Sequence, residues 1–214
     1  MSRGKFITLE GIEGAGKSTV ARLVCESLRA RGIMVLATRE PGGTPLAERV
    51  RQVVLERGTE AVSPVTETLL MFAARALHVD NVIRPALARG EWVVCDRFTD
   101  ATRAYQGCGR GVDAALIESL AQAVHADLKP DLTLLLDLPV ATGLARARAR
   151  SGAASDRFEA ETVSFFERVR AGYLALAARE PGRFRRIDAA QGLEEVEHQI
   201  GIVLALTSIS RGLA

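Results

Sequence analysis

The sequence predicts an α/β fold in which helices cover both faces of a doubly wound, five-stranded parallel sheet. Two observations support this prediction. Short, mostly apolar runs alternate with longer helical patterns from one end of the chain to the other, which is typical of βαβ units. The 214 residues, 48% hydrophobic and 25% charged, can bury a sizeable core and favour a single domain over residues 1–214.

Five strands are predicted, each a short run that ends at a charged residue: 6–10, 34–39, 92–96, 132–137 and 184–188. Between them, apolar residues recur with helical spacing. This spacing predicts helices over residues 17–31, 44–56, 65–88, 113–126, 140–150, 159–179 and 193–206. Glycines at positions 32, 58, 90 and 192 fall where these elements should stop.

Composition excludes several classes of protein. A formal net charge of +2 is too balanced for a chain that coats nucleic acid or an acidic membrane. Cys25, Cys95 and Cys108 are odd in number and form no C-x-x-C pair, which argues against a disulfide framework or a zinc site. No apolar segment approaches the roughly 18 to 20 residues of a membrane span. We therefore expect a cytoplasmic protein that binds neither nucleic acid nor membrane.

The strongest motif follows the first predicted strand. Residues 11–18 read Gly-Ile-Glu-Gly-Ala-Gly-Lys-Ser, which fits the phosphate-loop pattern G-x-x-x-x-G-K-[ST] and opens a helical stretch. Backbone N–H groups of such a loop surround phosphates, and the helix adds its positive N-terminal end. Lys17 would reach the β- and γ-phosphates of ATP, and Ser18 would bind Mg²⁺. The predicted ATP-binding residues are Gly11, Ile12, Glu13, Gly14, Ala15, Gly16, Lys17, Ser18 and Thr19.

A second site is predicted beside this loop. The guanine-reading motif N-K-x-D is excluded because Asn81 is the only asparagine, and no D-x-x-G switch motif occurs. The segments 39–43 (Arg-Glu-Pro-Gly-Gly) and 96–98 (Asp-Arg-Phe) come at the ends of the second and third strands. Open α/β sheets bind ligands at this carboxyl edge, so Asp96 is placed to hold Mg²⁺ or its water shell. Ordinary ion pairs, Arg39 with Glu40 and Asp96 with Arg97, are the alternative. Together, the motifs favour a small kinase.

These segments resemble the thymidylate kinase family. The matching motifs, in the family's order, are Gly11 to Ser18, Arg39-Glu-Pro-Gly-Gly43, Leu70-Met-Phe-Ala-Ala-Arg75, Asp96-Arg-Phe98, Ala104-Tyr-Gln-Gly107 and Ile187-Asp-Ala189. The resemblance covers nearly the whole chain. It implies the P-loop nucleoside monophosphate kinase fold and transfer of the γ-phosphoryl group of Mg-ATP to dTMP, giving dTDP. Without it, a kinase for another nucleoside monophosphate and a non-kinase ATP-binding switch stay open.

The resemblance also implies how dTMP is held. Arg97, together with Arg39 or Arg51, would bind the 5′-phosphate, and Arg75 would hydrogen-bond the thymine ring. Glu13 would lie near the 3′-hydroxyl and the acceptor phosphate. The further expected contacts are Thr102 at the polar edge of the base, Tyr105 near the 2′ carbon of the sugar, and Gln106.

One position departs from the family pattern. The aromatic ring that stacks on thymine usually stands four residues before the base-reading arginine, where this chain has Met71. Phe72 stands three residues before Arg75, and both spacings share a helix face. We expect Phe72 to stack on the base, with Met71 as the alternative.

Arginines near the run of small residues 151–155 resemble those of the bacterial form of the family. In that form a mobile lid supplies arginine to the transferring phosphoryl group because the phosphate loop lacks one, and here Gly14 stands where the other form has it. We expect the lid over about residues 146–158, and a homodimer through an apolar face of residues 65–88. The flanking arginines are Arg146, Arg148, Arg150 and Arg157; the catalytic candidates are Lys17, Arg97, Arg150, Arg157 and Glu13.

Overall fold

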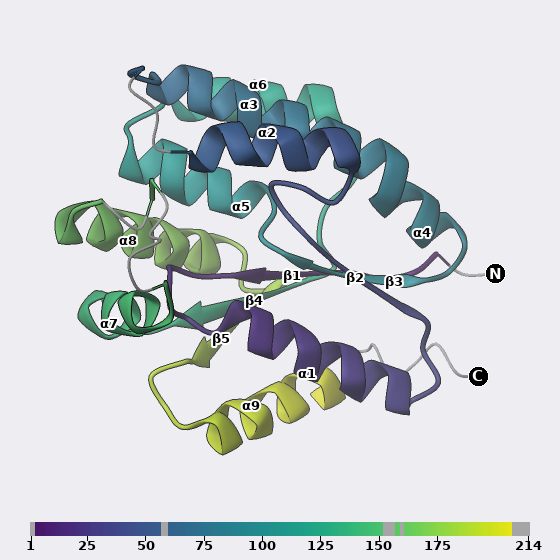
Figure 1. The fold of residues 1–214 in the computed structure, drawn as a ribbon. Coiled ribbons are helices and arrows are strands. Elements are labelled where there is room, and N and C mark those ends of the chain that lie inside the picture. The colour runs from purple at the N-terminus through teal and green to yellow at the C-terminus, as the bar shows by residue number, and fades with distance from the viewer. Residues whose placement is uncertain (1–2, 57–59, 152–156, 159–160, 207–214) are drawn as a thin grey trace.

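The computed structural model describes residues 3–56, 60–151, 157–158 and 161–206 (Figure 1). Its strands are β1 (Phe6–Glu10), β2 (Val35–Arg39), β3 (Trp92–Asp96), β4 (Leu132–Asp137) and β5 (Phe184–Asp188). They form one parallel sheet in the order β2-β3-β1-β4-β5, which confirms the predicted fold class. Only β2 departs from its predicted bounds, because its ladder begins where Val35 pairs with Trp92.

Helices lie on both faces of the sheet (Figure 1). Helices α1 and α9 cover one face, and α4 and α8 lie against the other, beyond which α2, α3 and α6 form an outer layer. No helix in the described ranges is long and apolar enough to cross a membrane. The helices are α1 (Lys17–Ala30), α2 (Pro45–Leu55), α3 (Pro64–His78), α4 (Arg84–Ala88), α5 (Thr99–Thr102), α6 (Ala114–His125), α7 (Val140–Ser151), α8 (Val163–Arg179) and α9 (Leu193–Leu206).

Two π-helical segments were not predicted. The expected helix over 65–88 is divided into α3, the π-helical η1 (Val79–Ile83) and α4. This wider turn comes just before Pro85, which has no N–H to continue the α-helical ladder. The second π-helical segment, η2 (Arg103–Gly109), follows α5 where no helix was expected, because two glycines and several short polar residues give 99–109 a low helix propensity. Burial of its side chains stabilises it instead.

Helix α8 begins later than predicted. The expected start was residue 159, which lies outside the described residues together with residue 160. Thr162 is the N-cap of the helix: its hydroxyl accepts a hydrogen bond from the backbone N–H of Phe165.

The core is centred on β1 and β4, whose residues are all buried. Strand β1 lies between β3 and β4, so the turn that follows β1 meets the carboxyl ends of both neighbours. Such a point at the carboxyl edge of an open parallel sheet is the usual position of a ligand site.

Candidate active site

A cavity of about 340 Å³ opens at this carboxyl edge. It is lined by the phosphate loop, by the ends of β2 and β3, and by parts of α2, α3, α5, η2 and α7. Most residues predicted for the site line this one cavity: Glu13, Gly14, Gly16, Lys17, Ser18, Thr19, Arg39, Arg51, Met71, Arg75, Asp96, Arg97, Thr102, Tyr105, Gln106 and Arg150.

The phosphate loop has the shape that its sequence predicts. Gly16 takes a left-handed conformation with φ 85° at the start of α1, and no side chain caps this helix end. The first N–H groups of an uncapped helix can bind an anion, and Gly16 to Thr19 line the cavity. Gly14 has φ 72°, and a Cβ there would meet the carbonyl oxygen of Gly143 at 1.9 Å. No side chain fits at position 14 without displacing α7. Gly11, Ile12 and Ala15 are buried beneath the loop rather than on the cavity wall.

Lys17 is folded back over its own loop. Its Nζ donates hydrogen bonds to the carbonyl oxygens of Gly11 at 3.2 Å and Ile12 at 2.9 Å. Burial, assisted by the positive charge of Arg97, lowers the pKa of Lys17 to about 8. Phosphate oxygens that replace these carbonyls would hold the ammonium in its charged form.

Asp96 and Ser18 fit the coordination of Mg²⁺ in kind. Asp96 lines the cavity at the end of β3, and its buried Oδ1 atom has no hydrogen-bond partner within the described part of the chain. Carboxylate and hydroxyl oxygens are hard ligands of the type that Mg²⁺ selects. No cluster of three His, Cys, Asp or Glu residues able to bind a metal was found among the described residues.

Arg97 lies at the centre of the site and has an unusual backbone conformation, with φ 70° at the end of β3. Its Nη2 donates to Glu13 at 2.8 Å and to the hydroxyl of Tyr105 at 3.0 Å. The Tyr105 hydroxyl donates in turn to Glu13, and its ring lies 4.7 Å below the guanidinium. These three predicted residues therefore form one contact group between the phosphate loop and η2.

Arg75 is aimed at the cavity by a partner that sequence reasoning missed. Its Nε donates to Glu40 at 2.7 Å, and its Nη2 donates to Thr102 at 3.1 Å. Glu40 is also bound by His78 at 3.0 Å; although burial alone would raise the pKa of Glu40, Arg75 and His78 keep it below its usual range. The remaining Nη1 is buried and has no described partner, so a ligand base could accept from it.

The other acceptor-site predictions fare differently. Phe72 does not line the cavity: it packs in the core with Val112, Ile117 and Ala121 on the far side of α3. The preference for Phe72 over Met71 is therefore corrected, because the helical rotation of α3 brings Met71 to the wall. Arg39 pairs with Glu48 at 2.9 Å, and Arg51 donates to the carbonyl of Pro41 at 2.9 Å; both arginines line the cavity.

The arginines near 151–155 separate into three positions. Arg150 lines the cavity. Arg146 donates to the carbonyl oxygens of Ala189 and Ala190, which directly follow β5. Arg157 is not on the wall; its Nη2 binds Glu67, a buried carboxylate of α3 that also accepts from Gln106 and Arg110. The predicted lid over about 146–158 includes 152–156, which lie outside the described residues.

Several supporting residues were missed by sequence reasoning. Glu40 and Glu67 could have been found, since Glu40 is part of the motif 39–43 and Glu67 precedes Met71 by one helical turn. Glu10 and Tyr173 carried no signal. Tyr173 on α8 donates to Glu10 across 163 positions of sequence.

Comparisons with known proteins give the family. The family model described as thymidylate kinase matches residues 9–200. A thymidylate kinase of Alkalilimnicola ehrlichii is 56% identical over 214 residues, covering 100% of this chain and 98% of the relative. One from Pseudomonas syringae pv. syringae is 58% identical over 210 residues, 98% of this chain and 99% of its own. The crystal structure of thymidylate kinase from Ehrlichia chaffeensis superposes with a TM-score of 0.75 at 33% identity, covering 94% of this chain and 99% of that one. These matches, over nearly the whole length of the chain, show that it belongs to the thymidylate kinase family.

Proposed function

We propose that the cavity binds ATP over the loop 11–18 and dTMP against α3 and η2, and that the residues named below carry out the transfer. The family assignment sets the reaction, in which the γ-phosphoryl group of ATP passes to dTMP and gives dTDP and ADP. The observation that carries the residue assignment is the meeting of Lys17, Arg97 and Arg75 in one cavity.

The chemistry requires cations and alignment rather than a base. An anionic oxygen of the dTMP phosphate bonds to the γ-phosphorus while the bond from that phosphorus to the β–γ bridging oxygen breaks. No general base is needed because the attacking oxygen is already deprotonated. Lys17 would bind the β- and γ-phosphates, and Arg97 the acceptor phosphate, so that two anions can approach in line.

Mg²⁺ would be held at Ser18 and Asp96. When bound, it compensates negative charge on the β- and γ-phosphate oxygens. The buried Oδ1 of Asp96, which no described residue contacts by a hydrogen bond, supports this assignment.

The acceptor base would lie on Met71 with its polar edge toward Arg75 and Thr102. Nη1 of Arg75 has no hydrogen-bond partner among the described residues and could donate to a carbonyl oxygen of the base. The flexible thioether of Met71 is suited to cover a ring face. Gln106 would contribute through its position on the same wall.

A coupled assay with ATP and a panel of nucleoside monophosphates tests the proposal. We expect dTMP to be the preferred acceptor over UMP, dCMP and dGMP, and turnover to stop when EDTA removes Mg²⁺. Preference for another nucleoside monophosphate would reassign the acceptor site. ATP hydrolysis that does not depend on an acceptor would instead favour a nucleotide-binding switch. A switch protein would have no use for a pocket around Arg75 and Arg97.

Discrimination against ribose is expected to depend on the ring of Tyr105. A hydroxyl at the 2′ carbon, buried against this ring without a partner, would cost about 1 to 3 kcal/mol. Tyr105→Ala should therefore narrow the ratio of kcat/KM between dUMP and UMP, which differ only in that hydroxyl. Tyr105→Phe keeps the ring and removes only the bonds to Arg97 and Glu13, so it should lower kcat and leave the ratio unchanged. An unchanged ratio in Tyr105→Ala would return Tyr105 to a purely structural role.

We also propose that the chain forms a homodimer and works in the cytoplasm. Apolar side chains on the outer faces of α2 and α3 stay 45–57% exposed, which supports a partner surface for a second copy: Leu46, Val53, Val65 and Leu69. The three cysteines are free thiols, as is usual for proteins of a reducing compartment.

A further inference from the structure

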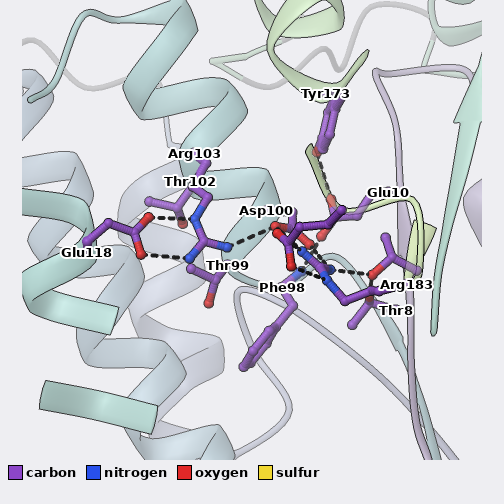
Figure 2. A network of polar contacts seen from close by, with 12 residues as sticks. Thr8, Glu10, Phe98, Thr99, Asp100, Thr102, Arg103, Glu118, Tyr173 and Arg183 are labelled. Atoms are coloured by element: carbon purple, nitrogen blue, oxygen red, sulfur yellow. Dashed lines mark hydrogen bonds and ion pairs between the residues drawn. The ribbon is translucent and has the colours of Figure 1, made fainter. Parts of the chain in front are cut away.

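Tyr173 and Glu10 form a buried polar pair behind the cavity that the proposed chemistry does not use. The Tyr173 side chain, on α8, is 1% exposed, and Glu10, the last residue of β1, is fully buried. The Tyr173 hydroxyl donates to Oε2 of Glu10 at 2.7 Å, as Figure 2 shows. Neither residue is part of the cavity wall.

Both carboxylate oxygens of Glu10 accept hydrogen bonds. Oε1 of Glu10 accepts the backbone N–H of Phe98 at 2.8 Å. Asp100, whose charge bears on Glu10, is itself paired with Arg183 at 2.6 Å and Arg103 at 2.9 Å (Figure 2). Burial raises the pKa of Tyr173, so the phenol keeps its proton and can donate it to Glu10. Buried polar groups that are satisfied in this way fix one geometry.

The same hydroxyl touches Arg97. Nη1 of Arg97 donates to the Tyr173 oxygen at 3.2 Å and to the carbonyl of Gly11 at 3.0 Å. Nη2 donates instead to Glu13 and Tyr105, which both line the cavity. The guanidinium therefore has a supported side, Nη1, whose partners lie off the wall, and a cavity side, Nη2, whose partners a ligand could exchange.

We propose that Tyr173, fixed by Glu10, is a positioning residue for Arg97: it holds Nη1 from behind so that Nη2 is presented to the acceptor phosphate. The inference rests on the proposed function, because it takes the acceptor phosphate as the ligand of Arg97. It is specific to the hydroxyl. A phenylalanine at 173 would fill the same volume but leave Nη1 of Arg97 and Oε2 of Glu10 each without this partner.

Tyr173→Phe is the direct test. We expect kcat with dTMP to fall about tenfold, since loss of alignment at a reacting centre acts on the transition state, while KM for ATP stays within about twofold. Thr8→Val is the matched control. Thr8 is buried on the same strand as Glu10, and its hydroxyl bonds to that of Thr133 at 2.8 Å. The variant loses this buried hydrogen bond, which does not involve Arg97. Both variants should lower Tm by similar amounts, and only Tyr173→Phe should lower kcat.

A double-mutant cycle separates positioning from general destabilisation. In an Arg97→Lys background, which lacks the guanidinium, Tyr173→Phe should cost less than about twofold in kcat. An equal loss in both backgrounds, or a wild-type kcat for Tyr173→Phe, would overturn the proposal. If Tyr173→Phe does not fold, Glu10→Gln replaces the acceptor at Oε2 with an N–H donor, and the same loss of kcat and the same dependence on Arg97 are expected.

The outcomes also separate this inference from the proposed function. Wild-type enzyme that fails to phosphorylate dTMP would refute the function. Wild-type enzyme that phosphorylates dTMP, together with a Tyr173→Phe variant of unchanged kcat, would refute only the role of Tyr173.

Discussion

Lys17→Met is expected to lower kcat by at least about a hundredfold and to leave the fold intact. The ammonium is the side-chain cation that the phosphate loop itself can place on the β- and γ-phosphates, and loss of one such preorganised contact typically costs 10²- to 10³-fold. Methionine keeps the length of the side chain, so the wall of the cavity is preserved. In the absence of nucleotide, the variant loses only the two bonds to the carbonyls of Gly11 and Ile12.

The control for this variant is Lys5→Met, which makes the same chemical change outside the cavity. Lys5 is 46% exposed and pairs with Asp131, so its loss should leave kcat unchanged. Steady-state kinetics and the Tm of both variants are the measurements. A Lys17→Met enzyme within a few-fold of wild type would mean that the loop 11–18 has been assigned the wrong role.

The pH dependence of the wild-type enzyme provides a second test of the role of Lys17. The pKa of Lys17 in the free enzyme is about 8, so its positive charge is present below pH 8 and is lost above it. Since ATP binding needs that charge, kcat/KM for ATP should fall as pH rises through about 8. The falling limb should be absent in Lys17→Met, which lacks the ammonium at position 17.

The sheet and the phosphate loop could be predicted because they depend on local sequence. The two central strands, β1 and β4, are short buried runs, and the loop's glycines, lysine and serine lie within eight consecutive residues. Convergence of Arg39, Asp96 and the loop followed from topology alone, since the carboxyl ends of parallel strands share one edge. The phosphate-loop motif therefore predicted which residues bind phosphate, and the parallel arrangement of the strands predicted which edge of the sheet they share.

What could not be predicted depends on packing between distant segments. The choice between Met71 and Phe72 is decided by how α3 is rotated against α6, which adjacent positions on one helix do not reveal. Arg157 binds Glu67, 90 positions earlier, so its charge is directed to α3 rather than to the cavity. Tyr173 is part of no motif, and its partners come from distant segments: Glu10 ends β1 and Arg97 follows β3.

These contacts distinguish the arginines near 151–155 and lead to the second large expected effect. Arg150→Ala should lower kcat far more than it raises KM for ATP, by up to about a thousandfold if the guanidinium acts on transition-state charge as an arginine finger does. Arg150 is the member of this group that lines the cavity. Position 14 of the phosphate loop cannot supply the charge instead, because its Cβ would collide with the backbone of Gly143.

Arg148→Ala is the matched control, since Arg148 is exposed on the same helix two residues away and does not line the cavity. Its kcat should stay at the wild-type value. Arg157→Ala should give a smaller loss than Arg150→Ala, because removing it leaves Glu67 with Gln106 and Arg110 as partners. Adding Gly14→Arg to Arg150→Ala should not restore kcat, given the collision at position 14. Wild-type kcat in Arg150→Ala, or a larger loss in Arg157→Ala, would show that the phosphoryl group takes its last cation from elsewhere.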